Sequence, residues 1–434
     1  MYKKLKYLHR LIEIIKIFAK YNSLFPLKII TNNRLFGSFI KLISNKDISQ
    51  EPGKRLMLAL TEAGPSFIKL GQTLSTRPDI VGASIAHNLE HLQDKLPPFP
   101  AIKAKEIIEH DLGSKVSDLF LSFDEKVIAA ASMAQVHFAV TSDGHEVAVK
   151  VLRPNIERDF TKDINLFIWI ATIIERSAPK LKRYKLLDVI KSFQKSVKTE
   201  MDLEIEAASA SEIFENFKSD PNILIPKVDW ERTSKRVLTT ERITGVSINQ
   251  RSSIHSLNQN PQQIVKNLLE FFFKQIFRDG FFHADIHPGN LFINPSGKIG
   301  IIDFGIMGRI DLNTRKHLGQ ILLAFLKRDY HAVAKVHFEA GWIPAHQSIT
   351  DFSQACRIIG EPLLKVPEKQ NSIAKILGRL FQVAEQFEIQ LPPELLLLQK
   401  AMFLAEGTSR KLSPTTNIWI MIKPFMKKWL VKNI

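Results

Sequence analysis

The fold of this chain is decided by the stretch FFHADIHPGNLFI at residues 281–293, which is followed by IIDFG at residues 301–305. The first stretch has the spacing H-x-D-x-x-x-x-N, and the second carries D-F-G behind an apolar run. Between them, NPSG at residues 294–297 predicts a tight turn, because Asn, Pro, Ser and Gly each favour turn geometry. We therefore expect a hairpin, with strands at 290–293 and 298–302, that brings the two motifs together.

The side chains in these motifs are those that kinase-type phosphoryl transfer requires. Asp285 is the candidate catalytic residue, which would accept the proton of the incoming nucleophile. Asn290 and Asp303 are the candidate metal ligands, because Mg²⁺ is a hard ion that prefers oxygen atoms and keeps several waters. A D-F-G tripeptide alone often arises by chance. The ordered set of residues 283, 285, 290 and 303 around a hairpin rarely arises by chance, so a kinase-like fold is predicted.

Length and composition are those of a globular protein. The 434 residues allow a large core and favour one two-lobed domain with additions, and the 45% hydrophobic content excludes a disordered chain. Cys356 is the single cysteine, so no internal disulfide can form, which fits a reducing compartment. The apolar run at 164–174 is too short to cross a bilayer and is assigned to the core.

The formal net charge of +16 is concentrated at the two ends of the chain. Residues 1–46 contribute +9 and residues 410–434 contribute +6, so the remaining body carries +1. Basic ends of this kind favour contact with an anionic membrane surface. They do not favour nucleic-acid binding, because the positive residues accompany apolar stripes at the termini and form no stacking platform.

The first twenty residues predict a basic amphipathic helix. Glu13 and Lys16 interrupt its apolar stretch and no small-residue cleavage site follows, which excludes a secretory signal. Lys and Ile dominate where a mitochondrial presequence would have Arg and Ser. Two interpretations stay open: a surface helix docked on the body, or a helix in the headgroup region of an anionic membrane. The apolar stripe consists of Leu8, Leu11, Ile12, Ile15 and Phe18.

Residues 417–434 carry a second amphipathic pattern. Lys423 and Pro424 interrupt the apolar run, so the pattern does not predict a transmembrane helix. Its Trp and Lys residues suit a membrane interface. The alternative is a terminal helix packed on the core. The apolar stripe consists of Ile418, Met421, Ile422, Phe425, Trp429 and Leu430.

The sequence before the catalytic motifs predicts the smaller lobe of a kinase-like fold. Strands are expected at 136–140 and 146–152, with a turn through SDG at 142–144. The second strand contains VAVK at residues 147–150, the form of the strand whose lysine holds the α- and β-phosphates. That lysine is Lys150, and we predict that Glu206 pairs with it. The alternative is that Glu206 belongs to a solvated helix face.

Two further elements complete the expected lobes. A strand at 237–241 precedes the hinge, and a buried helix at 262–280 leads into the catalytic loop. Ahead of the smaller lobe, a Gly-Pro pair at 64–65 begins a helix, since Pro suits a first helical turn. That helix contains FIKLGQ at 67–72, in which the Lys and Gln share a face and the Gly permits a close approach.

Four motifs together point to one family. In these motifs the chain resembles the UbiB family of atypical, protein-kinase-like proteins linked to ubiquinone biosynthesis, over roughly residues 50–410. Two of them, K-x-G-Q and an alanine-rich loop, are not shared with ordinary protein kinases. The motifs are KLGQ at 69–72, AAASMAQ at 129–135, the E-x-D of Glu200 and Asp202, and the pair of motifs at 283–305.

The resemblance implies an α+β, two-lobed protein-kinase-like fold with a helical N-terminal extension and a helix-rich C-terminal lobe. It implies that ATP or ADP binds with Mg²⁺, for slow ATP hydrolysis or phosphotransfer to a small molecule. Alanine methyl groups would stiffen the loop over the nucleotide, because they restrict the positive φ that glycine allows. The candidate nucleotide-binding residues are Ala129, Ala130, Ala131, Ser132, Gln135 and Lys150.

The resemblance also implies an occluding element. The K-x-G-Q helix would fold across the entrance that protein substrates use in ordinary kinases and would meet the E-x-D segment over the nucleotide. The regulatory candidates are Lys69, Gly71, Gln72, Glu200 and Asp202. The predicted parts of the chain are a basic amphipathic segment at 1–47, the helical extension at 48–110, the N-lobe at 111–245, the C-lobe at 246–410 and a basic amphipathic tail at 411–434.

The implied setting is quinone biosynthesis at a membrane. The expected partners are an anionic membrane surface and either a quinone-precursor lipid or quinone-biosynthesis enzymes, and a homodimer is left open. Because no uninterrupted apolar span precedes Ile434, membrane contact is expected to be peripheral. The expected location is the cytoplasmic side of a bacterial inner membrane, and the mitochondrial inner membrane fits less well.

Two other functions stay open at this point. A non-catalytic, nucleotide-gated scaffold for biosynthetic enzymes is one, although an intact set of acids argues against a dead site. A small-molecule kinase of the aminoglycoside or choline type is the other, although it does not explain K-x-G-Q or the alanine-rich loop. The sequence does not support hydroxylase chemistry, because it contains neither G-x-G-x-x-G opening a βαβ unit nor an iron triad.

Overall fold

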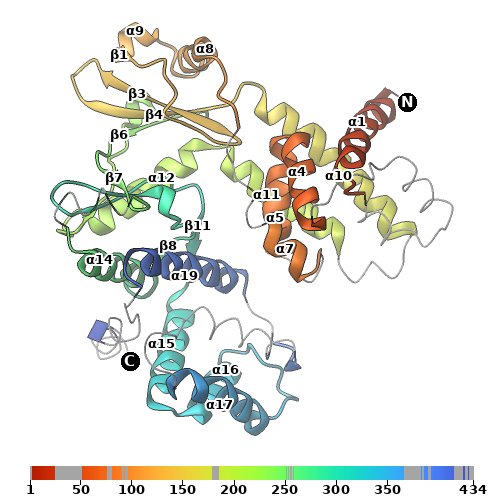
Figure 1. The fold of residues 1–434 in the computed structure, drawn as a ribbon, viewed down its shortest axis with the longest axis vertical. Helices are drawn as coiled ribbons and strands as arrows, with labels where there is room; N and C mark the ends of the chain where they lie inside the picture. The colour runs from red at the N-terminus through yellow and green to blue at the C-terminus, as the bar shows by residue number, and fades with distance from the viewer. Residues whose placement is uncertain are drawn as a thin grey trace. The chain divides into compact units, whose positions relative to one another are not determined.

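The computed structural model consists of two compact units (Figure 1). The first comprises residues 1–205 and 229–240, and the second comprises residues 206–228 and 241–434. The segment 206–228, which the predicted boundary at 245 assigns to the N-lobe, thus belongs to the second unit. The residues that the structure describes are 2–24, 51–75, 81–89, 92, 96–177, 185–250, 252, 254, 257, 259–365, 383, 386–389, 392–414, 424–425 and 429.

A five-stranded sheet forms one part of the first unit. The hairpin predicted from the sequence is confirmed as β3 and β4, which pair antiparallel, and Gly144 at φ +89° permits the turn between them. The strand predicted at 237–241 is confirmed as β6. The strands are β1 (Phe120–Phe123), β2 (Ala129–Ala130), β3 (Ala134–Thr141), β4 (Glu146–Leu152) and β6 (Val237–Glu241), in the order β1-β3-β4-β6 with β2 paired to β3.

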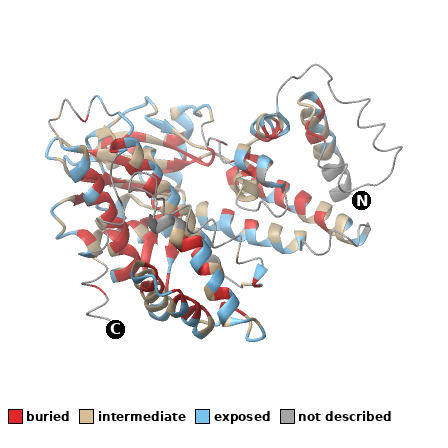
Figure 2. Cartoon of the chain, turned by 60° about the horizontal axis from the view of Figure 1, so that its bottom comes forward, coloured by how far each residue is buried: buried red, intermediate tan, exposed pale blue. Residues whose placement is uncertain are grey.

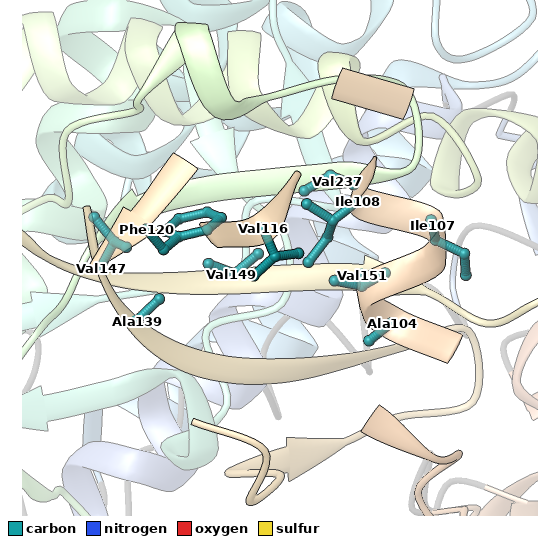
Figure 3. Packing of buried hydrophobic residues seen from close by; sticks show 10 residues of the cluster. All are labelled: Ala104, Ile107, Ile108, Val116, Phe120, Ala139, Val147, Val149, Val151 and Val237. Carbon is teal, nitrogen blue, oxygen red and sulfur yellow. The ribbon is translucent and has the colours of Figure 1, made fainter. Parts of the chain in front are cut away.

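The core of this sheet lies under α8 (Ala101–Leu112) and α9 (Val116–Leu119) (Figure 3). Alternate residues of β4 (Val147, Val149 and Val151) are buried in this core, as the two-residue period of a strand requires. Buried residues, red in Figure 2, mark the strands and the helix faces that pack on them. Hydrophobic burial therefore determines which face of the β3–β4 hairpin packs against α8 and α9.

The other part of the first unit is a set of helices. α5 begins at Pro65, as predicted. It is held to α10 by an edge-on contact between Phe67 and Phe167, whose ring centroids are 5.0 Å apart. The apolar run at 164–174 lies in α10 and contributes buried residues, so its assignment to the core is confirmed. The helices are α1 (Tyr2–Lys20), α4 (Pro52–Ala63), α5 (Pro65–Ser75), α7 (Ala83–Leu89), α10 (Ile156–Ser177) and α11 (Leu186–Glu200).

The first helix, α1, is docked on the other helices of its unit. The Arg10 guanidinium donates to Asp163 Oδ1 at 2.9 Å and to the Ala63 carbonyl oxygen at 3.0 Å. The Phe18 ring lies 6.3 Å from that of Phe67. Lys20 lies 2.7 Å from a carboxylate oxygen of Glu62. These contacts support the first of the two interpretations of the N-terminal segment, a docked surface helix.

The second unit begins with α12 (Leu203–Phe217), most of which belongs to it, and contains two small sheets. The predicted catalytic hairpin is confirmed: β9 and β10 pair antiparallel, and Gly297 at φ +81° permits the turn. β8 (Phe281–His283) pairs with β11 (Met307–Arg309). The chain therefore enters the predicted catalytic loop from β8 and passes from the D-F-G segment into β11. The other strands are β5 (Ile223–Leu224), β7 (Val246–Ser247), β9 (Leu291–Ile293) and β10 (Ile299–Ile301), in the order β5-β10-β9-β7.

The buried helix predicted at 262–280 is confirmed, with an unforeseen change of helix type. It consists of α14 (Pro261–Phe273) and a π-helical segment, η3 (Lys274–Asp279). The Phe277 ring lies 5.1 Å from that of Trp429, and the Phe273 ring lies 6.5 Å from that of Phe425. These two tail residues therefore pack on the second unit, as the core-packing interpretation of the C-terminal segment expects.

After β11, the described elements of the second unit are helices, in line with the predicted helix-rich C-terminal lobe. They are α15 (Leu312–Lys327), α16 (Tyr330–Glu339), α17 (Ile349–Lys365) and α19 (Pro393–Leu412) (Figure 1). Among the described residues, no helix combines the length and apolar character needed to cross a bilayer. Residues 25–50, and the tail from 415 onward apart from 424–425 and 429, lie outside the described residues.

Removing the Phe120 side chain is expected to destabilise the first unit strongly. Phe120 is 2% exposed within the sheet core, so Phe120→Ala should cost about 3–5 kcal/mol of unfolding free energy. The adjacent Leu121 is 69% exposed, so Leu121→Ala should stay within about 0.5 kcal/mol of the parent. Urea unfolding followed by circular dichroism compares the two, and equal losses would contradict the packing in Figure 3.

Candidate active site

A buried histidine connects the two motifs that open the sequence analysis. His283 Nδ1 accepts a hydrogen bond from the Asp285 backbone N–H at 3.1 Å, and Nε2 lies 3.4 Å from the Ile302 carbonyl oxygen, to which it can donate. The Gln275 side chain accepts from the His283 backbone N–H at 2.8 Å. Full burial lowers the pKa of His283. A neutral imidazole can accept at one nitrogen and donate at the other, as this position requires.

The Asp285 carboxylate, the candidate proton acceptor, faces two basic groups. Its Oδ1 lies 3.0 Å from Lys400 Nζ, and its Oδ2 lies 3.8 Å from His287 Nε2. His287 Nδ1 accepts from the Gly289 backbone N–H at 3.0 Å, which fixes the ring within the short 3₁₀ turn η4 (Pro288–Asn290). The carboxylate is 25% exposed, so small molecules can reach it.

Asn290 joins the loop to the hairpin. Its side-chain nitrogen donates to the Asp285 carbonyl oxygen at 3.3 Å, which leaves the amide oxygen as the group able to bind a metal. Its own carbonyl oxygen accepts from the Ile302 N–H at 3.0 Å. Asp303 follows Ile302 directly, so this hydrogen bond places the two predicted metal ligands, Asn290 and Asp303, on neighbouring stretches of backbone.

Asp303 has a strained backbone beside a second carboxylate. Its φ of +63° is unusual for a residue with a side chain and occurs where surrounding contacts impose it. A Cβ atom on Gly305 would lie 3.4 Å from Asp303 Oδ1 and 3.6 Å from Glu206 Oε2. Gly305 therefore leaves methyl-sized space next to both carboxylates. Oxygen donors around such a space suit a hard cation such as Mg²⁺.

Within the described ranges, no three His, Cys, Asp or Glu side chains are grouped in a way that could hold a metal ion. The predicted site has a different composition, one Asn and one Asp. A Mg²⁺ ion bound there would complete its octahedral coordination with waters and phosphate oxygens.

The alanine-rich loop of the first unit is a tight hairpin. β2 pairs with β3, and the Ala131 N–H donates to the Ala134 carbonyl oxygen at 2.8 Å. The Ala131 carbonyl oxygen accepts from Arg153 Nε at 3.0 Å and from Nη2 at 2.8 Å. Ser132 is 1% exposed. The loop is therefore held by its own backbone and by Arg153, a residue that the sequence reasoning did not identify.

Gln135, a candidate nucleotide contact, has structural partners. Its side-chain oxygen accepts from the Phe99 N–H at 2.9 Å, and its side-chain nitrogen donates to the Phe99 carbonyl oxygen at 3.1 Å. Its amide nitrogen also lies 2.8 Å from His137 Nε2. Lys150 lies on β4 in the first unit and Glu206 lies on α12 in the second, so their ion pair stays a prediction, as do the nucleotide contacts.

The structure brings the lysine of K-x-G-Q to the first acid of E-x-D, as predicted. Lys69 Nζ lies 2.8 Å from Glu200 Oε2, and the side chains are only 12% and 17% exposed. A Cβ on Gly71 would overlap Leu92 and Leu60, which confirms the close approach expected at this glycine. The Gln72 side chain donates to the Leu92 carbonyl oxygen at 3.3 Å. The regulatory role of these residues stays a prediction.

Asp202 has a local task at the start of α12. Its Oδ1 accepts from the Glu204 N–H at 3.2 Å, which satisfies one of the free donors of a helix N-terminus. An open groove of about 420 Å³ lies beside it along α11, lined by Lys191, Lys195, Lys198 and other residues. Basic side chains thus gather next to the E-x-D segment in the first unit.

Comparison with known proteins identifies the family. Residues 91–337 match the ABC1 atypical kinase-like domain, and residues 356–417 match the UbiB helical domain. A protein of Marinobacter nauticus named "Probable protein kinase UbiB" is 42% identical over 386 residues, which cover 88% of this chain and 71% of that protein. The chain belongs to the UbiB family.

Other relatives of this UbiB-family chain agree. A protein of the same name from Cellvibrio japonicus is 37% identical over 427 residues, or 97% of this chain and 77% of that protein. The fold is similar to that of a solved structure from Mycobacterium tuberculosis, the complex of Rv3197 with erythromycin. That likeness has a TM-score of 0.57 at 22% identity and covers 91% of this chain and 98% of the other, which supports the kinase-like fold.

The buried His283 should make stability depend on pH. Because its pKa in the folded chain lies below the ordinary value of 6.5, its contribution is complete above pH 6.5 and is lost as the pH falls below that value. His283→Asn keeps a hydrogen-bond acceptor and does not titrate. The variant should be less stable at pH 7.5. Between pH 6.5 and 5 its loss of stability should be shallower, by up to about 1.4 kcal/mol per pH unit.

Urea unfolding at a series of pH values measures both slopes. His337 titrates in both proteins, since burial lowers its pKa to about 4, so some acid dependence should remain in the variant. An equally steep decline in the variant and the parent would show that His283 does not bind its partners as a neutral imidazole.

Proposed function

We propose that this chain is a Mg²⁺-dependent nucleotide-binding enzyme that hydrolyses ATP slowly or transfers phosphate to a small molecule, in support of ubiquinone biosynthesis at a membrane. The observation that carries the proposal is the arrangement of Asp285, Asn290 and Asp303 around the β9–β10 hairpin of the second unit. Membership of a kinase-like family supports it.

Each residue would have a distinct task in this chemistry. Asp285 would accept the proton of water or of a substrate hydroxyl, and its partly exposed carboxylate is reachable. Asn290 and Asp303 would hold Mg²⁺, which when bound neutralises charge on the phosphate oxygens. From the first unit, Lys150 would contribute a phosphate-binding cation, as its V-A-V-K motif predicts. His283 would keep the loop in register with the D-F-G segment through its two hydrogen bonds.

Features of the first unit are the reason why we propose water or a small molecule, and not a protein, as the substrate. The Lys69–Glu200 ion pair and the tight alanine-rich hairpin support a closed, stiff nucleotide site. Such a site fits water or a small hydroxyl compound better than a protein loop. This is why the proposal names hydrolysis and small-molecule transfer instead of protein phosphorylation.

Replacing Asp303 by Asn should abolish Mg²⁺-dependent nucleotide binding, because the variant loses the charged ligand of the metal. Calorimetric titration with ATP, with and without Mg²⁺, measures the effect, and an affinity loss of about 100-fold or more is expected. Asp351→Asn, at an exposed position of α17, is the matched control. Normal Mg²⁺-dependent binding by Asp303→Asn would overturn the metal assignment.

The membrane part of the proposal rests on charge. Residues 1–46 and 410–434 carry nearly all of the net charge of +16. Part of the apolar stripe of each end packs within its own unit, so we infer peripheral, electrostatic attachment to anionic lipid. The inferred location is the cytoplasmic face of a bacterial inner membrane, near a quinone-precursor lipid or the enzymes that process it.

The full chain should pellet with vesicles that contain anionic lipid and should hydrolyse ATP faster in their presence. Binding should weaken steeply as salt rises from 50 to 500 mM, because screening removes electrostatic attraction. Vesicles of neutral phosphatidylcholine at the same concentration are the control. The absence of both pelleting and stimulation with anionic vesicles would refute the membrane proposal.

A further inference from the structure

The helix α19 is firmly attached to the body of the second unit. Its bounds are Pro393–Leu412, and it contacts α14 and β11, as the ribbon in Figure 1 also shows for α14. Leu398 and Ala401 are buried on either side of Lys400. The backbone at Lys400 is therefore fixed, and the flexible four-carbon stem is the part that can move.

The Lys400 side chain ends at the candidate catalytic carboxylate. Its Nζ lies 3.0 Å from Asp285 Oδ1. The Lys400 side chain is 40% exposed and that of Asp285 is 25% exposed, so an incoming ligand can reach both groups. An ion pair this exposed contributes at most about 1 kcal/mol to stability. Stability alone therefore gives a weak reason for a lysine at this place.

The electrostatics of the site give a stronger reason. Asp285, Asp303 and Glu206 bring three carboxylates to the second unit, and the loop from 283 to 290 contains no Lys or Arg. A transferred phosphoryl group spreads negative charge over three oxygens as it reacts, and enzymes place cations against that charge. Lys400 is a cation held by a fixed helix, within reach of the atom that accepts the proton.

We propose that Lys400 is a catalytic residue whose ammonium group contacts the transferred γ-phosphoryl group and stabilises the charge on it in the transition state. The inference rests on the proposed nucleotide hydrolysis. It gives the C-terminal helical region, which lies outside the kinase-like match at 91–337, a direct part in the chemistry. The ion pair with Asp285 then holds the ammonium group at the site until nucleotide binds.

When water is the nucleophile, its oxygen forms a bond to the γ-phosphorus, and Asp285 accepts one water proton. The bond from the γ-phosphorus to the β–γ bridging oxygen breaks, and its electron pair stays on the oxygen of ADP. Lys400 stays protonated throughout and transfers nothing. ATP and water give ADP, inorganic phosphate and a proton, which Asp285 releases to solvent.

The test compares Lys400→Met, Lys400→Gln and Lys400→Arg with the parent chain and with Lys335→Met. Lys335 is an exposed lysine of α16 in the same unit that also faces a carboxylate, with its Nζ 3.7 Å from Glu339 Oε1, and serves as the matched control. Steady-state ATP hydrolysis gives kcat and KM. Binding of Mg²⁺, ADP and aluminium fluoride, a mimic of the transferred phosphoryl group, gives a second readout that does not require turnover.

Lys400→Met and Lys400→Gln should each lower kcat and the affinity for the ADP–aluminium fluoride complex by about 100-fold. KM for ATP and the affinity for ADP alone should change less than about threefold, because the charge is contacted in the transition state and not in the ground state. Lys400→Arg should keep a tenth or more of kcat, since it keeps the cation. Lys335→Met should match the parent.

Equal kcat values in the parent and both neutral variants would overturn the inference while leaving the proposed hydrolysis intact. Faster hydrolysis in the variants would overturn it as well and would make the ion pair a brake. A parent chain that does not hydrolyse ATP refutes the proposed function. Even then, equal binding of the ADP–aluminium fluoride complex by the parent and Lys400→Met, or no binding by either, would overturn the role of Lys400.

Discussion

The site depends on one buried imidazole that must stay neutral. His283 accepts from the Asp285 N–H and faces the Ile302 carbonyl oxygen, so a single ring sets the distance between the catalytic loop and the strand that ends at Asp303. Burial lowers the pKa of His283 and keeps the acceptor nitrogen unprotonated. Without this ring the Asp285 N–H would lose its acceptor and the loop would be held less firmly against the strand that leads to Asp303, so more of the proposed metal–phosphate geometry would have to form at each binding event.

Sequence reasoning succeeded where local chemistry determines structure. The β9–β10 hairpin, the β3–β4 hairpin and the close approach at Gly71 follow from turn residues, strand alternation and a glycine without a Cβ. It did not find the contacts of Arg153 with the Ala131 carbonyl oxygen or of Lys400 with Asp285. These partners are 22 and 115 residues apart in the chain, and their residue types carry no periodic signal. Such contacts depend on how whole helices and strands pack.

The alanine-rich loop differs from the glycine-rich loop of ordinary kinases in a way that bears on the proposed nucleotide site. A glycine-rich loop can close over phosphates because its backbone N–H groups are unpaired and its φ angles are free. In this chain the Ala131 N–H is bonded to Ala134, and the Ala131 carbonyl oxygen is bonded twice by Arg153. The alanine methyl groups and the hydrogen bonds already made by Ala131 both oppose closure of the loop over phosphates. A stiff loop that contributes fewer N–H groups increases the need for charge from elsewhere in the chain.

The two ends of the chain illustrate why an amphipathic pattern does not by itself decide between a membrane and a core. An apolar stripe gains about the same free energy from either burial, so hydrophobicity alone cannot select between them. In this structure α1 is fixed by the Arg10–Asp163 ion pair and by Phe18 against Phe67, while Trp429 packs on Phe277. These contacts are specific in geometry and would be lost on insertion into lipid. In the membrane attachment that we propose, the attraction between the lysines and arginines of both ends and anionic lipid is long-ranged and needs no rearrangement of the packed helices.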